Sequence, residues 1–204
     1  MLYEMRTYNL KPGTVAEYEE RFAKTLPNRE KHSKLGAFWH TDFGPLNQVI
    51  HIWPYEDMAE RARVRAAAAQ EPDWPPKGQD LIVSQESEIL LPAPFMRPLE
   101  RKHMGNVYEM RIYTYQPGTI PEVLKRWSDL IAGRERFSPL AACLYTDVGA
   151  LNRFIHIWPY RDLAEREKAR NSAREDGHWP PPTREFILRQ ENKVLIPAAF
   201  SPLK

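Results

Sequence analysis

The chain has 204 residues, of which 42% are hydrophobic and 27% are charged, and its formal net charge is +2. This length accommodates one large domain or two of roughly 100 residues. The balanced charge excludes the basic stripe of a typical nucleic-acid-binding protein. No apolar run is long enough to span a membrane, and MLYEMRTYNL lacks the pattern of a signal peptide. The single cysteine, Cys143, leaves no internal disulfide, so we expect a cytoplasmic protein. From the charge and the hydropathy together we expect no nucleic-acid and no membrane partner.

The first half of the chain alternates strand and helix signals. Alternation of apolar and polar side chains predicts strands at 2–9, 35–43, 46–53 and 81–90. After the first strand, Thr14 and Glu17 are predicted to form a capping box that begins a helix, and Thr119 and Glu122 repeat this box in the second half. After the third strand, Asp57 and Glu60 predict the same for a second helix, whose arginines (Arg61, Arg63 and Arg65) are expected to be solvated.

The second half repeats the first without a gap. LNQVIHIWPYEDMAERARVR (46–65) returns as LNRFIHIWPYRDLAEREKAR (151–170). We therefore divide the chain into repeats at 1–96 and 107–204, joined by a polar linker at 97–106. Each repeat has the order β-α-β-β-α-β of a ferredoxin-like unit, which leaves one face of its sheet bare. The predicted fold is α+β, with the two antiparallel sheets closing into one α/β barrel within the chain.

Three motifs carry a family resemblance. The sequences YEMRTYNLKPGT (3–14), TDxGxLNxxIHIWPYxDxAER (41–61) and LLPAPF (90–95) resemble the NIPSNAP family of the dimeric α/β-barrel superfamily. The resemblance implies the barrel fold, which single-repeat relatives build from two chains. It also implies a choice of functions, because the superfamily includes cofactor-free monooxygenases, haem enzymes, isomerases and lyases.

The two faces of each strand suggest where a site lies. We expect Tyr3 and Met5 to lie beneath the helices, and Glu4, Arg6 and Tyr8 to point into the barrel. By the same alternation His51 and its counterpart His156 are predicted to point inward. A histidine beside carboxylates in an aromatic pocket suits a general base or a metal ligand. The candidate catalytic residues are His51, Asp42, Glu86, His40 and Arg6. The candidate substrate-binding residues are Trp53, Tyr8, Ser84, Arg189, Tyr145, His156 and Trp158.

The same residues also permit a structural interpretation. Glu4 and Arg6 are able to form an ion pair that only stabilises the fold, and Asp42 or Glu86 is able to satisfy His51. The repeats differ where His40 becomes Tyr145 and Ser84 becomes Arg189. These differences indicate either one working pocket or drift after duplication. The Trp-Pro-Pro segments (74–76 and 179–181) are predicted to gate the pocket or to form an oligomer contact.

Three functions remain open at this stage. The first is a cofactor-independent enzyme of oxygenase, isomerase or lyase type, which binds a small, partly hydrophobic molecule in the barrel and uses histidine–carboxylate acid–base chemistry. The second is a haem-binding protein in which His51 or His156 coordinates iron. The third is a non-catalytic binding or protein-interaction module. We expect no obligatory cofactor, a small-molecule ligand and a homodimer.

Overall fold

The computed structural model describes residues 1–204 and has the predicted order of elements in both repeats. The first repeat contains β1 (Leu2–Leu10), α1 (Val15–Glu30), β2 (Ala37–Phe43), β3 (Gln48–Tyr55), α2 (Met58–Ala68) and β4 (Ile82–Pro92). The second contains β5 (Val107–Tyr115), α3 (Ile120–Glu135), β6 (Ala142–Val148), β7 (Arg153–Tyr160), α4 (Leu163–Glu175), a 3₁₀ turn at Arg184–Phe186 and β8 (Ile187–Pro197).

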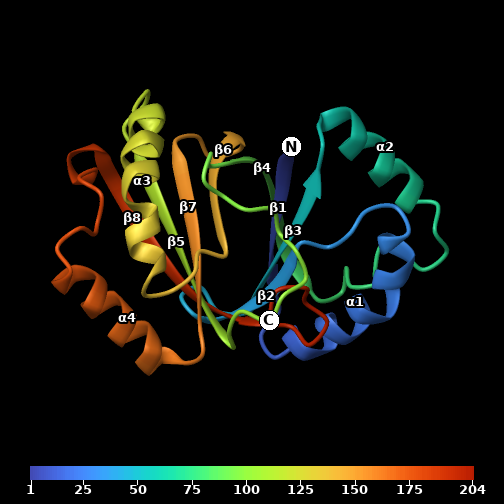
Figure 1. Ribbon diagram of the computed structural model, residues 1–204. Helices are drawn as coiled ribbons and strands as arrows, with labels where there is room; N and C mark the ends of the chain where they lie inside the picture. Colours follow the sequence, from blue (N-terminus) through green and yellow to red (C-terminus); the bar gives the residue numbers. More distant parts are fainter.

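The strands form one closed barrel in the order β1-β3-β2-β8-β5-β7-β6-β4. All neighbouring strands are antiparallel, and the two repeats join where β2 pairs with β8 and β4 pairs with β6. Helices α1 and α2 lie outside the barrel on one side, and α3 and α4 lie on the other (Figure 1). The prediction of a ferredoxin-like barrel closed within one chain is confirmed.

Most of the barrel interior is apolar, and the faces predicted for the first three strands were wrong. Tyr3 and Met5 belong to a buried cluster with residues of both repeats, including Trp39 and Tyr108, whose rings are 5.4 Å apart. No helix residue belongs to this cluster, and apolar side chains fill it. The face that carries Glu4 lies instead beneath the helices, where arginines of α2 neutralise the carboxylate.

The two repeats meet at two seams that carry different polar pairs. At the β4–β6 seam, the Glu88 carboxylate contacts Nη1 of Arg153 at 3.2 Å. At the β2–β8 seam, Nζ of buried Lys193 donates to Oε1 of Gln48 at 2.8 Å. Lys193 occupies in the second repeat the position of Glu88 in the first, and Arg153 occupies that of Gln48. Each buried polar side chain is therefore satisfied by the opposite repeat.

Helix capping follows the prediction in one pair of helices only. The Asp57 carboxylate accepts from the N–H of Glu60 at 2.8 Å, and Asp162 caps α4 in the same way. Thr14 and Thr119 do not cap α1 and α3, because their hydroxyls donate to the carbonyls of Lys11 and Gln116. The predicted capping boxes at these two threonines were therefore wrong.

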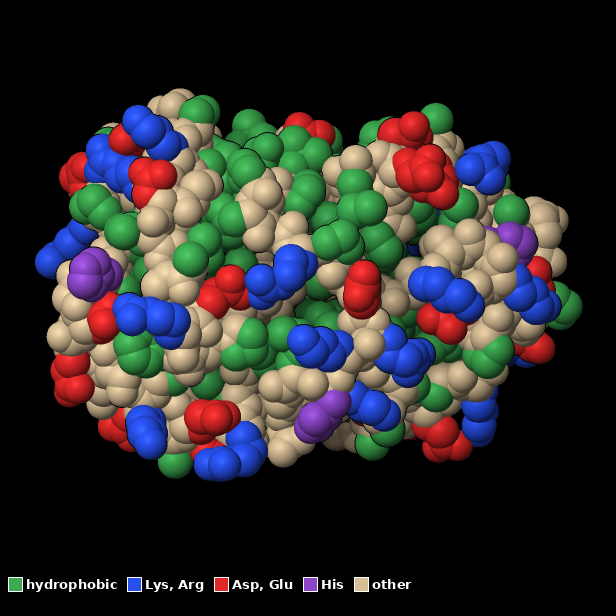
Figure 2. Space-filling model, viewed as in Figure 1, with side chains coloured by type: hydrophobic (Ala, Val, Ile, Leu, Met, Phe, Trp, Pro, Cys, Tyr) green, Lys and Arg blue, Asp and Glu red, His purple; other side chains and the backbone are tan.

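The linker packs against the barrel. Leu99 and Met104 contact the interior cluster, and Lys102 bridges to Leu203 near the C-terminus. No helix is both long and apolar enough to cross a membrane. Positive and negative side chains are mixed over the face in Figure 2. The homodimer and the cytoplasmic location stay predictions.

Candidate functional site

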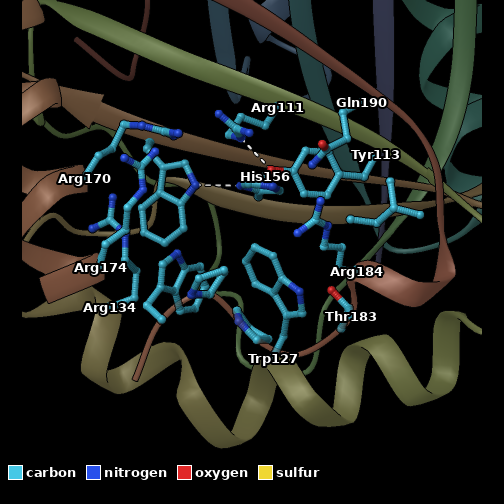
Figure 3. A pocket seen from close by; sticks show the side chains of 15 residues that line it. Arg111, Tyr113, Trp127, Arg134, His156, Arg170, Arg174, Thr183, Arg184 and Gln190 are labelled. Carbon is cyan, nitrogen blue, oxygen red and sulfur yellow. Dashed lines mark hydrogen bonds between the residues drawn. The ribbon is translucent and has the colours of Figure 1, made fainter. Parts of the chain in front are cut away.

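Each repeat holds a cavity between its sheet and its helices, outside the barrel. The cavity of the first repeat has a volume of about 300 Å³, and that of the second about 350 Å³. Equivalent residues supply most of both walls. Those of the first are Arg6, Tyr8, Phe22, Arg29, His51, Trp53, Arg65, Trp74, Pro75, Pro76 and Gln85. Those of the second are Arg111, Tyr113, Trp127, Arg134, His156, Trp158, Arg170, Trp179, Pro180, Pro181 and Gln190 (Figure 3).

A histidine–tryptophan pair lies at the floor of each cavity. The indole N–H of Trp53 donates to Nδ1 of His51 at 2.7 Å, and Trp158 donates to Nδ1 of His156 at 2.6 Å. An indole N–H is a donor only. Nδ1 must therefore be the unprotonated nitrogen, and the proton of the neutral ring sits on Nε2. That Nε2 is buried without a partner in both histidines.

Burial keeps these histidines neutral. His51 is 2% exposed, and desolvation, with a smaller contribution from the Arg6 charge, lowers its pKa to about 3. Desolvation and the Arg111 charge likewise hold the pKa of His156 well below its usual range. The expected proton shuttle near neutral pH requires a titrating imidazole with a bare nitrogen. Neither imidazole meets these requirements.

The same tautomer bears on the haem hypothesis. An iron-ligating imidazole offers a bare nitrogen to the metal and usually donates its other N–H to an acceptor. Here the indole N–H of Trp53 or Trp158 occupies the bare nitrogen, and the remaining nitrogen carries hydrogen. His51 and His156 therefore do not fit an axial iron ligand.

A buried carboxylate underlies each cavity. Glu4 is 0% exposed and contacts Arg61 at 2.7 Å, Arg65 at 3.3 Å and the Ser87 hydroxyl at 2.7 Å. Burial raises the pKa of Glu4, but these partners outweigh that effect and the pKa is lowered. The carboxylate therefore stays ionised and ties β1 to α2.

Glu109 forms the equivalent network in the second repeat. It contacts Arg111 at 3.0 Å, Arg166 at 2.6 Å and Arg170 at 3.1 Å. Burial again opposes ionisation of Glu109, and the arginines again lower its pKa overall. The prediction that the arginines of the second helices are solvated was thus wrong for the two that reach each buried carboxylate.

A second arginine in each cavity has no carboxylate partner. Arg29 and Arg134, each 3% exposed, come from the long helices α1 and α3. Each guanidinium stacks on the indole of Trp53 or Trp158, with 4.3 Å from Cζ to the ring centroid. Burial lowers the pKa of both groups. The sequence-based candidates missed both residues, although their matching positions in the two repeats were a usable signal.

The Trp-Pro-Pro segments form part of the cavity walls. Arg21 of α1 holds the first segment's loop by donating to the Lys77 carbonyl at 2.7 Å and to Asp80 at 2.8 Å. Arg126 of α3 holds the equivalent loop through Glu185 at 2.6 Å. Placement of these segments beside the pocket fits the predicted gate, whereas movement of the loop stays a prediction.

The structure brings together only some of the predicted site residues. Arg6, Tyr8, His51 and Trp53 line the first cavity, and His156 and Trp158 line the second. Glu86 is aligned with Thr7 and Ser84 with Asn9, which places both on the barrel-facing side of the sheet, away from His51. The cause is that the faces of β1 and β3 were assigned in reverse, whereas the face of β4 that carries Ser84 and Glu86 was assigned correctly.

The remaining candidates also lie elsewhere. Asp42 is exposed where a bulge interrupts the pairing of β2 with β8. His40 contacts Glu19 of α1 at 2.7 Å through Nδ1. Arg189 is exposed and pairs with Glu191 at 3.2 Å. Tyr145 is partly buried and packs against the apolar cluster beneath the helices of the second repeat. None of these residues lines either cavity.

Fold and site together define a tandem ferredoxin-like barrel protein whose ligand-sized cavities lie outside the barrel, between sheet and helices. The NIPSNAP family model matches residues 3–97 and again residues 108–202. The chain therefore belongs to the NIPSNAP family.

Known proteins support this assignment over the whole chain. Protein NipSnap homolog 3A of Homo sapiens is 34% identical over 218 residues, which cover 100% of this chain and 86% of the relative. Protein NipSnap homolog 3B of Homo sapiens is 33% identical, with 99% and 85% covered. The structure of a candidate monooxygenase from Lactobacillus acidophilus superposes with a TM-score of 0.71 at 12% identity, covering 96% of this chain and 92% of that one. At that identity the likeness shows the fold alone.

Proposed function

We propose that the protein binds small organic anions with a flat apolar body in the cavities between its sheet and its helices. The observation that carries this proposal is the pair Arg29 and Arg134, each a buried guanidinium beside a tryptophan-walled cavity without a carboxylate partner. Burying an unpaired charge is costly, and stacking on an indole satisfies the face of the guanidinium but does not neutralise it. A bound anion supplies the missing charge.

The shape and composition of the walls support a flat ligand. In the second cavity, Trp127 and Trp179 meet edge to face with ring centroids 4.8 Å apart. In the first, Phe22 and Trp74 meet in the same way at 5.4 Å. Aromatic walls with a few charged groups are typical of small-molecule sites. The protonated Nε2 of His51 or His156 adds a potential donor at the floor.

Binding is better supported than acid–base catalysis. No Asp or Glu lines either cavity. Tryptophan occupies the bare nitrogen of each histidine. A general base within reach of a ligand is the first requirement of the catalytic mechanism expected from the sequence, and these walls do not provide one.

Titration with benzoate tests the proposal. The indole N–H signals of Trp74 and Trp179 should shift in two-dimensional NMR spectra, whereas that of Trp39, inside the barrel, should not. Arg29→Met should abolish the shift of the Trp74 signal and spare that of Trp179, and Arg134→Met should do the reverse. Unmoved signals at Trp74 and Trp179, or equal movement at Trp39, would rule the proposal out.

A further inference from the structure

The two cavities differ in charge at their mouths. Arg174, near the C-terminal end of α4, and Arg184, in the 3₁₀ turn, both line the second cavity. The first cavity has Ala69 and Gln79 at the equivalent positions. Both arginines are exposed, and neither forms a salt bridge. The second repeat thus adds two cationic groups that the ion-pair networks of the fold do not use.

The buried carboxylate does not balance these added charges. Glu109 already contacts Arg111, Arg166 and Arg170. Arg134, Arg174 and Arg184 therefore line the second cavity without a carboxylate partner, whereas the first cavity has only Arg29 in that state. A ligand with more negative charge is therefore attracted more strongly to the second cavity than to the first.

The uncompensated arginines stand on two sides of the second cavity. Figure 3 shows Arg134 and Arg174 on one side and Arg184 on the other, with aromatic rings between them. A guanidinium binds a carboxylate through parallel N–H donors, and such charge-assisted bonds are stronger than neutral ones. The arrangement thus fits two separated carboxylates better than one.

We propose that the second cavity recognises flat dicarboxylates whose charges lie at opposite ends, one held by Arg134 and Arg174 and the other by Arg184, while the first cavity binds one carboxylate and gains nothing from a second. This inference rests on the proposed function, because it assigns different ligand classes to the same two cavities. It also gives the divergence of the repeats a role. The sequence located that divergence at His40/Tyr145 and Ser84/Arg189, none of which lines a cavity.

Three probes separate charge from geometry. Benzoate carries one carboxylate, terephthalate carries two at opposite ends of the ring, and phthalate carries two on adjacent carbons. All three are fully ionised at pH 7.5. Indole signals of Trp179 and Trp74 report the two cavities separately. At Trp179, terephthalate should bind about tenfold more tightly than benzoate or phthalate, as expected for one added charge-assisted contact. At Trp74 the three affinities should agree within about threefold.

Reciprocal variants locate the selectivity. Arg184→Gln should remove the terephthalate preference at Trp179. Ala69→Arg with Gln79→Arg should create a preference of about tenfold at Trp74. The control is Arg63→Ala with Lys168→Ala, two exposed residues outside both cavities, which should change neither preference.

The outcomes distinguish the two proposals. If benzoate binds both cavities but terephthalate shows no preference for the second, or Arg184→Gln leaves that preference intact, the dicarboxylate inference is wrong and the proposed function stands. Equal binding of phthalate and terephthalate at Trp179 overturns the opposite-end geometry. If none of the probes shifts Trp74 or Trp179, the proposed function itself fails.

Discussion

The two repeats are alike in the charges that are buried beneath their helices and different where the cavities open. The buried carboxylates Glu4 and Glu109 each have three arginine partners within 4 Å, and the histidine–tryptophan pairs match within 0.1 Å. The cavity mouths have Ala69 and Gln79 in one repeat and Arg174 and Arg184 in the other. A buried charge is costly to leave unpaired, whereas an exposed one is cheap to add or remove.

Beside the cavities, one pair of contacting positions differs between the repeats at both residues. The missing side chain of Gly78 leaves room for Tyr18, because a Cβ at Gly78 would lie 2.9 Å from Cε2 of that ring. In the second repeat the same positions hold Thr183 and Val123. A larger residue on the loop thus faces a smaller one on the helix. Volume is preserved across the wall, as close packing requires.

Removing a buried carboxylate should give the largest effect and the same effect in both repeats. Glu4→Gln and Glu109→Gln each leave arginines of the second helix without their counter-ion. We expect each change to lower the free energy of unfolding by about 3 kcal/mol. Urea denaturation measures it. The exposed pair Lys24–Glu20 provides the control, since Glu20→Gln should change the free energy of unfolding far less than either buried substitution. A marked inequality between Glu4 and Glu109 would break the claimed equivalence.

Acid should destabilise the protein through its two neutral histidines. In the unfolded chain a histidine has a pKa of about 6.5, whereas folding lowers that of His51 to about 3 and depresses that of His156 in the same direction. Between these values the unfolded chain binds protons that the folded chain does not, so stability falls as the pH falls. The slope is about 1.4 kcal/mol per pH unit per histidine.

Single substitutions isolate the contribution of each histidine to the loss of unfolding free energy at low pH. His51→Gln and His156→Gln keep an acceptor for tryptophan but do not titrate. Between pH 7.5 and 5.5 each variant should lose about 1.4 kcal/mol less unfolding free energy than the unmodified protein. Equal losses in variant and unmodified protein would mean that folding does not lower the pKa of that histidine.

The smallest expected effect is a difference in unfolding free energy between substitutions of Arg29 and Arg134. Nη1 of Arg29 donates to the Ser33 hydroxyl at 3.0 Å, whereas Nη1 of Arg134 is buried without a partner. Both guanidinium groups also donate to a tyrosine and stack on a tryptophan. Arg29→Met should therefore cost about 1 kcal/mol more unfolding free energy than Arg134→Met, the net contribution of one hydrogen bond. Equal costs would remove this distinction between the repeats.

The hydrophobic periodicity of the segments and the internal repeat of the sequence were enough to predict the architecture. They gave the element order, the duplication and the closure of the barrel, because each depends on which residues alternate and how often. The same alternation divides a strand into two faces but does not say which face is inside. Glu4 and Arg6 suggested a polar interior because Arg61 and Arg65, the partners of Glu4 on α2, were interpreted as solvated.

Part of the candidate site was lost because the faces of the first three strands were reversed and that of the fourth was not. His51 and Trp53 were correctly grouped with Arg6 and Tyr8, since these residues share a sheet face. The expected carboxylate on β4, Glu86, lies on the opposite face. Arg29 and Arg134 reach the cavities from helices, and sequence spacing within a strand carries no information about such contacts. Tertiary packing alone defines them.

The seam contacts make the repeats non-interchangeable. In this chain Glu88 faces Arg153, and Lys193 faces Gln48. If two second repeats formed a barrel with each other, Lys193 of one would face Arg153 of the other, with like charges at both junctions. Two first repeats would set Glu88 against Gln48 without such repulsion. The junctions therefore disfavour a barrel of two second repeats. After duplication the second repeat depends on the first for a partner of compatible charge.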